Sequence, residues 1–230
     1  MFDILNLKPE TFGLDLSDLS LKIIKLKKRR GRLDLASFGE AKIKPRVVEG
    51  GEIKDEQSLA EVIKKAILKV EGERLKTKYV VVSLPEEKAF LQVIQMPIMK
   101  EEELKKAVCF EAENYIPLPA DEVYLDSQIV KPVFNNLDHL DVLITAMPKK
   151  TIDPYVSSLK MAGLIPVVLE TEPQAIVRAL VKNQISPYPI LLIDFGATKT
   201  SFIIFSGYFG CFSNSTTDAS GWISKESDLM

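Results

Sequence analysis

Hydrophobic and polar positions divide the first third of the chain into strands and one helix. Apolar runs at residues 11–16, 21–28 and 33–43 are separated by short polar turns, which predicts three consecutive antiparallel strands. Residues 55–70 then place apolar side chains at intervals of three and four, the stripe of an amphipathic helix. The run YVVVSL at residues 79–84 is almost wholly apolar, as in a strand covered on both faces. The predicted order is β-β-β-α-β.

The pattern changes in the middle of the chain and then returns to its earlier form. Residues 86–163 read as β-α-β-β-α, which predicts a compact α+β insert. A strand at 164–171, a helix at 172–183 and a strand, turn and strand at 188–205 follow. Residues 207–230 are Ser-rich and lack a helical or strand period, so we expect an irregular segment there.

One hairpin pattern occurs twice. When FGLDLSDLSLKIIKL is aligned with LLIDFGATKTSFIIF, Asp15 falls on Asp194 and the flanking apolar strands overlay. Internal repetition of this kind predicts that the same hairpin opens each of two β-β-β-α units.

The repeated turns have the chemistry of an anion site. A tight turn between two strands directs backbone N–H groups into one concavity, and small residues such as Gly196 and Ala197 let a phosphate approach. Asp15 and Asp194 would face each other across a cleft and hold a hydrated Mg²⁺. A single turn of this type is commonly structural, so the pair carries the hypothesis. The candidate nucleotide-binding residues are Asp15, Ser17, Ser20, Lys22, Asp194, Gly196, Thr198, Lys199 and Thr200.

Composition narrows the possible partners and locations. The formal net charge is -2, which gives no reason to expect nucleic acid as the main partner. The two cysteines form neither a metal-binding spacing nor a disulfide framework, which favours a reducing compartment. No signal peptide or membrane-spanning run is apparent, so we expect a partner to hold the chain at any membrane. A basic cluster around the predicted turn is interpreted as a solvated surface; its members are Lys25, Lys27, Lys28, Arg29, Arg30 and Arg32.

The stretch at residues 95–130 is the most specific part of the sequence. With GLDLSDLSLKIIKL, EIKD and AMPKKTIDPYVSSLKMAGLIPVVLETEPQAI, it resembles the PilM-type pilus assembly proteins of the actin-like ATPase superfamily. The resemblance covers about residues 10–206. The matching motifs within the most specific stretch are Met96-Pro97, Glu103-Leu104, Phe110-Glu111-Ala112, Tyr115-Ile116-Pro117 and Asp121-Glu122-Val123.

The resemblance implies an α/β fold with an α+β insert. Residues 1–85 and 164–187 would form an actin-like, ribonuclease-H-like first lobe with a mixed β-β-β-α-β-α sheet. Residues 86–163 would form an inserted subdomain like that of FtsA, and 188–206 the first hairpin of a second lobe. The segment at 207–230 departs from the family, so we expect the second half of a nucleotide site to be missing from this chain.

The resemblance also implies a function. Such proteins are cytoplasmic, bind ATP with Mg²⁺, and work at the base of the type IV pilus machine with other assembly proteins. They reach the inner membrane peripherally, by holding the N-terminal peptide of a membrane partner, PilN; self-association is a further expectation. Glu172 matches an acid that lies near the water attacking the γ-phosphate, or it merely places a negative charge at a helix start. Ser17 stands where the family usually has Gly.

Three functions therefore compete. The first is a pilus assembly scaffold, and the second is an actin-like ATPase whose two lobes close around Mg-ATP. The third is an FtsA-like cell-division protein, but SGWISKESDLM does not supply the amphipathic membrane helix of FtsA. We expect no ATP turnover by this chain, because closure needs both lobes.

Overall fold

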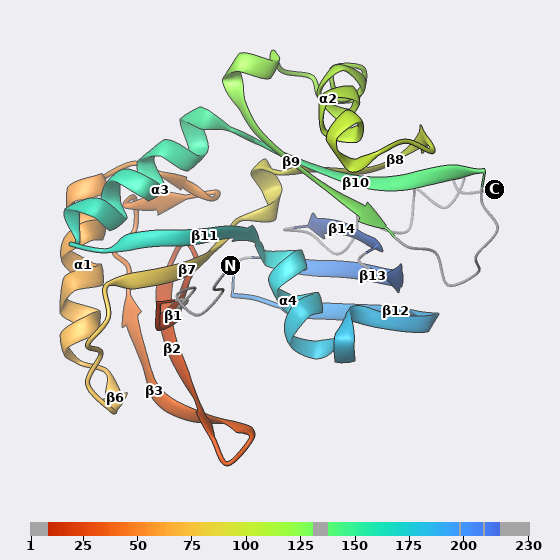
Figure 1. The fold of residues 1–230 in the computed structure, drawn as a ribbon. Helices are drawn as coiled ribbons and strands as arrows, with labels where there is room; N and C mark the ends of the chain where they lie inside the picture. Colours follow the sequence, from red (N-terminus) through yellow and green to blue (C-terminus); the bar gives the residue numbers. More distant parts are fainter. Residues whose placement is uncertain (1–8, 131–137, 198, 209, 217–230) are drawn as a thin grey trace, which may run out of the picture. The chain divides into compact units, whose positions relative to one another are not determined.

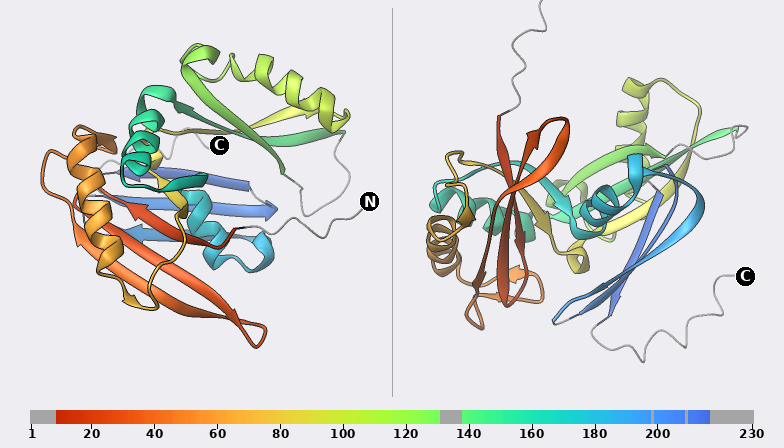
Figure 2. Two further views of the ribbon diagram at one scale, coloured as in Figure 1. Left: turned by 60° about the vertical axis from the view of Figure 1, so that its left-hand side comes forward. Right: turned by 90° about the horizontal axis from the view of Figure 1, so that it is seen from below.

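The computed structural model describes residues 9–130, 138–197, 199–208 and 210–216. The chain forms two compact units, shown as ribbons in Figures 1 and 2. The first unit comprises residues 1–85 and 150–170, and the second comprises 86–149 and 171–230.

A mixed six-stranded sheet organises the first unit. Its strand order is β11-β7-β1-β2-β3-β6, with β1 antiparallel to β2 and parallel to β7. The predicted order β-β-β-α-β is confirmed. The elements are β1 Thr11–Leu16, β2 Ser20–Arg29, β3 Arg32–Lys42, β4 Val48–Glu49, β5 Glu52–Ile53, α1 Glu56–Leu68, β6 Glu71–Gly72, β7 Tyr79–Leu84, α3 Lys149–Met161 and β11 Ile165–Thr171.

The core of the first unit follows the period-two alternation of its strands. In both β1 and β7, every second side chain is buried on one face of the sheet. The alternate side chains, on the other face, are only half-buried. Strand β7 is therefore covered less completely than its apolar run predicts. Helix α1 begins after Asp55, whose carboxylate accepts a hydrogen bond from the Ser58 backbone N–H at 2.9 Å. It buries Leu59 and Ile63, and Figures 1 and 2 show α1 and α3 on the same side of the sheet.

Helix α3 belongs to the first unit. The hydroxyl of Tyr155 is buried and donates to the Gly51 carbonyl at 3.0 Å. Ile152 and Leu159 are buried on the same helix. The apolar stripe of this helix identifies a buried face but not the element against which it packs, and the predicted insert at residues 86–163 stays a prediction.

The second unit contains two three-stranded sheets, ordered β8-β10-β9 and β12-β13-β14. Helix α2 packs Leu104 and Val108 into a core with Ile94 and Val142, and α4 packs Val177 into a core with two residues of β13. The elements are β8 Phe90–Pro97, α2 Glu101–Ala112, β9 Val123–Val130, β10 His139–Pro148, α4 Glu172–Leu180, β12 Ile185–Phe195, β13 Thr200–Tyr208 and β14 Gly210–Thr216, with single 3-10 turns at Glu86–Lys88, Ala120–Glu122 and Lys182–Gln184.

The prediction of an irregular segment from residue 207 onward is wrong for Gly210–Thr216. These residues form β14, which pairs antiparallel with β13. Strand pairing depends on backbone hydrogen bonds and on neighbouring strands, so a run of Ser, Asn and Thr without an apolar period can still form a strand. Strands β12, β13 and β14 complete the three strands of the repeated unit, whereas 217–230 lies outside the described residues.

Candidate functional site

The first predicted phosphate turn connects β1 to β2 and satisfies its own polar groups. The backbone N–H and the hydroxyl of Ser17 donate to the Ser20 carbonyl at 2.9 and 3.0 Å, and the Ser20 N–H donates to the Ser17 hydroxyl oxygen at 3.3 Å. The Asp15 carboxylate accepts a hydrogen bond from the Ser83 hydroxyl of β7, and Asp15 lies opposite an exposed Lys22 in the β1–β2 register. An incoming phosphate would therefore have to displace the hydrogen bonds that close this turn.

Asp18 fixes the same turn to a second one, a role that the sequence analysis missed. Its two carboxylate oxygens accept hydrogen bonds from the backbone N–H groups of Gly50 and Gly51, at 2.8 and 3.0 Å. Both glycines have positive φ, +55° and +72°, which side chains rarely adopt. The Gly-Gly pair signals a tight turn in the sequence, but nothing local identifies a partner 32 residues away.

The second predicted phosphate turn is closed by glycine. The Gly196 N–H donates to the Lys199 carbonyl at 2.9 Å, and a Cβ atom at residue 196 would lie only 2.9 Å from that oxygen. Close packing against the turn, rather than phosphate approach, is thus sufficient to require Gly196. Asp194 is exposed, Thr200 is half-buried opposite Phe195 in the β12–β13 register, and Thr198 lies outside the described residues.

Lys199 is held by two carboxylates. Its ammonium nitrogen lies 2.5 Å from Glu172 Oε2 and 3.0 Å from Glu87 Oε1. The Lys199 and Glu172 side chains are only 14% and 15% exposed. Burial alone would lower the pKa of Lys199, but the neighbouring carboxylates of Glu172 and then Glu87 outweigh it and raise that pKa. We call these three side chains the Lys199 clasp.

A third carboxylate lies beside the clasp. The Ser201 hydroxyl, two residues along β13, donates to Glu86 Oε1, and Glu86 is buried. Within the described part of the chain, Glu86 Oε2 has no hydrogen-bond partner. Two carboxylates therefore contact the Lys199 ammonium, and a third carboxylate accepts from Ser201 two residues along the strand, an acidic environment that disfavours phosphate.

The residues present therefore do not fit a preformed phosphate site. Ser17 and Ser20 are bonded to each other, and Lys199 is neutralised by acids. Asp15 belongs to the first unit and Asp194 to the second, so a shared Mg²⁺ site stays a prediction. Among the described residues, no group of three or more His, Cys, Asp or Glu side chains is arranged to hold a metal ion.

Glu172, the candidate catalytic acid, is the first residue of α4 and bonds Lys199. Its position at the positive end of the helix agrees with the structural alternative. Its proximity to an attacking water stays a prediction. The clasp was not predictable from local sequence, since Glu172 is 27 residues from Lys199.

An apolar groove lies between α3 and β11 in the first unit. Strand β11 is the terminal strand of its sheet, so its outer edge is unpaired within the described residues. Ile165 and Val167 are 38% and 42% exposed there. The groove has a volume of about 480 Å³ and is lined by Val156, Lys160, Leu164, Ile165, Pro166, Val167, Val168 and Leu169.

Most of the chain matches a known protein family. The family described as "Type IV pilus assembly protein PilM" matches residues 13–213. The chain belongs to this family. The predicted resemblance to PilM-type proteins is thus confirmed.

Solved structures agree with the family. The chain is similar to one in the structure described as "PilM-PilN type IV pilus biogenesis complex", with 27% identity and a TM-score of 0.79 over 91% of this chain and 62% of that one. It thus spans less than two thirds of that PilM-PilN complex chain. A second similarity is to the cytoplasmic domain of EpsL, an inner membrane component of the type II secretion system of Vibrio cholerae. It has 11% identity and a TM-score of 0.59 over 95% of this chain and 76% of EpsL. The predicted actin-like α/β fold is confirmed.

Among the described residues of this PilM-family chain, no helix is long and apolar enough to cross a membrane.

Replacing Lys199 with Met tests the clasp. We expect Lys199→Met to lower the free energy of unfolding by roughly 2 kcal/mol, because Glu172 and Glu87 would face each other without the cation. Urea unfolding measures this loss. The exposed Lys182→Met is the matched control and should change stability by less than about 0.5 kcal/mol. Equal effects of the two substitutions would contradict a structural clasp.

The clasp also predicts a pH dependence. Below the ordinary lysine pKa of 10.5, Lys199 is protonated in both the folded and the unfolded chain, so its full stabilisation is present. Because the pKa of folded Lys199 is raised, that stabilisation disappears as the pH rises through the folded value. The difference between the wild type and Lys199→Met should therefore stay constant up to about pH 10 and narrow above it.

Proposed function

We propose that this chain is a scaffold of the type IV pilus assembly machine. It would lie in the cytoplasm, peripheral to the inner membrane, and hold the N-terminal peptide of a PilN-type membrane partner. Membership of the PilM family and the similarity to a chain of a PilM-PilN complex support this proposal. The single observation that carries it is the apolar groove beside the free edge of β11.

An extended peptide fits the chemistry of this groove. The unpaired edge of β11 offers backbone N–H and C=O groups to an added strand, which gives affinity without dependence on side chains. The exposed side chains of Ile165 and Val167 would cover alternate apolar residues of such a peptide. Lys160 at the groove adds one cation that favours a carboxylate on the peptide.

A charged substitution in the groove tests the proposal. We expect Val167→Glu to weaken binding of a fluorescent PilN-type N-terminal peptide at least about tenfold, because binding would bury the new carboxylate against apolar side chains. Fluorescence anisotropy measures the affinity. Leu68→Glu, at the exposed end of α1 in the same unit, is the matched control and should leave the affinity unchanged.

Two outcomes would contradict the proposal that the groove binds the peptide. One is no detectable peptide binding by the folded wild type, which would remove the scaffold proposal for this chain. The other is equal affinity of Val167→Glu and the wild type, which would place the peptide elsewhere.

We further infer that residues 1–230 on their own bind ATP weakly and do not turn it over. For Lys199 to contact a phosphate it would have to leave two carboxylates, and the Ser17–Ser20 turn would have to open. Titration calorimetry with Mg-ATP should therefore detect no micromolar affinity. Micromolar binding that Asp15→Ala abolishes would contradict this inference and restore the predicted nucleotide site.

A further inference from the structure

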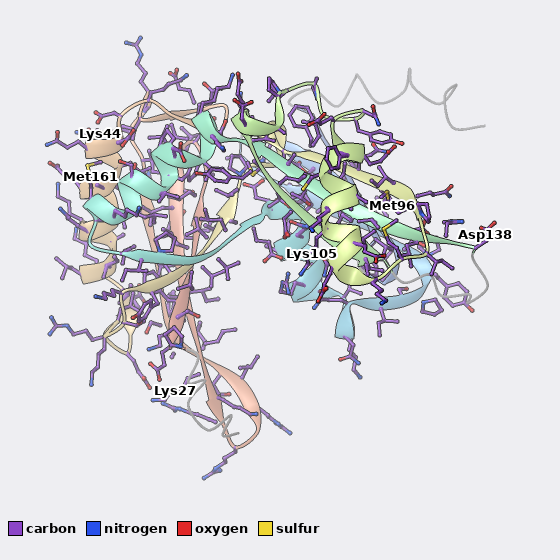
Figure 3. The ribbon with its side chains drawn as sticks, turned by 45° about the horizontal axis from the view of Figure 1, so that its top comes forward. Lys27, Lys44, Met96, Lys105, Asp138 and Met161 are labelled. Atoms are coloured by element: carbon purple, nitrogen blue, oxygen red, sulfur yellow. The ribbon has the colours of Figure 1, made fainter. Side chains whose placement is uncertain are left out.

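The outer half of the β2–β3 hairpin exposes one apolar face. Ile24 lies opposite Phe38 and Leu26 opposite Leu35 in the strand register, so these side chains share a face. Their exposed fractions lie between 45% and 55%, and that of Leu33, nearer the tip, is 70%. Figure 3 labels Lys27 on this projecting part of the hairpin. We call the five apolar residues the hairpin face; they are Ile24, Leu26, Leu33, Leu35 and Phe38.

On the opposite face of the hairpin, the apolar side chains are buried and the cations form ion pairs. Leu21 and Ile23 are buried there. Lys25 lies 2.9 Å from a Glu10 carboxylate oxygen, and Lys27 and Arg29 lie 3.1 and 2.7 Å from Glu73. Three members of the basic cluster therefore have acid partners within the first unit, and the prediction of a purely solvated turn holds only for the others.

The remaining cations lie around the tip of the hairpin: Lys28 is on the hairpin face, Arg30 is in the turn, and Arg32 lies opposite Arg29 on the other face. Lys28 is paired with Leu33 in the register, and Arg30 and Arg32 flank the turn at Gly31. Within the described residues, none of these three cations has a hydrogen-bond or ion-pair partner. Glu40 is a carboxylate on the same face, but it lies opposite Lys22 at the end of the hairpin that is remote from the turn. The part of the face near the turn is therefore apolar and cationic.

The turn itself places a cation where another residue would fit better. Arg30 has φ of +47° and Gly31 has φ of +80°. Two consecutive positive φ values are those of a type I′ turn, in which Asn-Gly is preferred and a longer side chain is strained. Local backbone preference therefore does not account for Arg30 at this position.

We propose that the hairpin face and the three free cations at the hairpin tip bind the surface of an anionic lipid bilayer. The apolar side chains enter the boundary between headgroups and acyl chains, while Lys28, Arg30 and Arg32 extend their long side chains to lipid phosphates. This contact is distinct from the peptide groove and adds a direct membrane contact to a partner-mediated one.

Charge and shape both favour a bilayer over an acidic peptide. The three cations are gathered at the hairpin tip, and the apolar side chains form a continuous ladder along one face behind that tip. An amphipathic surface of this type matches an anionic interface, which needs neither a groove nor a fixed register. A second copy packed on this face with its hairpin parallel would bring the same three cations against one another, which is unfavourable.

Vesicle co-sedimentation of the 1–230 chain tests the proposal. The wild type should sediment with vesicles of phosphatidylglycerol mixed with phosphatidylcholine and only weakly with pure phosphatidylcholine. The triple variant Lys28→Gln, Arg30→Asn, Arg32→Gln should bind the anionic vesicles about a hundredfold more weakly, about fivefold for each cation. It should stay folded, since Asn is favoured at the turn.

A second variant and a control isolate the two parts of the face. Leu33→Thr with Leu35→Thr keeps strand propensity and should reduce binding at least about tenfold through lost apolar burial. The control, Lys64→Gln with Lys69→Gln and Lys106→Gln, removes the same charge from exposed positions elsewhere and should stay within about twofold of the wild type.

Three results would overturn the proposal. One is no sedimentation of the wild type with anionic vesicles, and another is equal loss of binding in the control and the triple variant. The third is binding of soluble polyglutamate, but not of vesicles, which would identify an acidic protein as the occupant. Peptide binding in the groove is measured separately, so failure here leaves the scaffold proposal unaffected.

Discussion

The pairing of β1 with two different neighbours is the constraint on which the first unit depends. Strand β1 is antiparallel to β2 and parallel to β7, so one strand fixes both directions of the sheet. The antiparallel side leads to the β2–β3 hairpin with its exposed face. The parallel side leads through β7 to β11, the free edge and the groove. The bond from the Ser83 hydroxyl to Asp15 joins the two sides at the first turn.

Internal polar contacts hold both predicted phosphate turns in this chain. In the first, the hydroxyls of Ser17 and Ser20 close the turn, and in the second the Lys199 clasp neutralises the cation. Each arrangement uses polar groups that a nucleotide would otherwise contact. Withdrawing Lys199 would leave two partly buried carboxylates without their counter-charge, and this cost opposes ligand exchange.

Sequence patterns predicted the helices and strands better than they predicted which of these elements contact one another. The alternation in residues 11–16 and 79–84 and the stripe in α1 specify local structure, and these elements are confirmed. The same reasoning did not identify the packing of α3 against the Gly51 turn, because an apolar stripe does not specify the element that it contacts. It missed β14, whose pairing is carried by backbone groups, and the Lys199 clasp, whose acids come from distant parts of the chain. Long-range contacts have no local signature, so the site chemistry needed the structure.

The central claim is that the groove between α3 and β11 binds an extended peptide. Hydrogen exchange followed by mass spectrometry tests it most directly, since a strand added at the edge protects backbone amides. With a PilN-type N-terminal peptide present, exchange should slow in residues 164–169 and in the facing turns of α3, and stay unchanged in β2 and β3. Slowed exchange confined to α2 or to the second unit, with none in β11, would contradict the account.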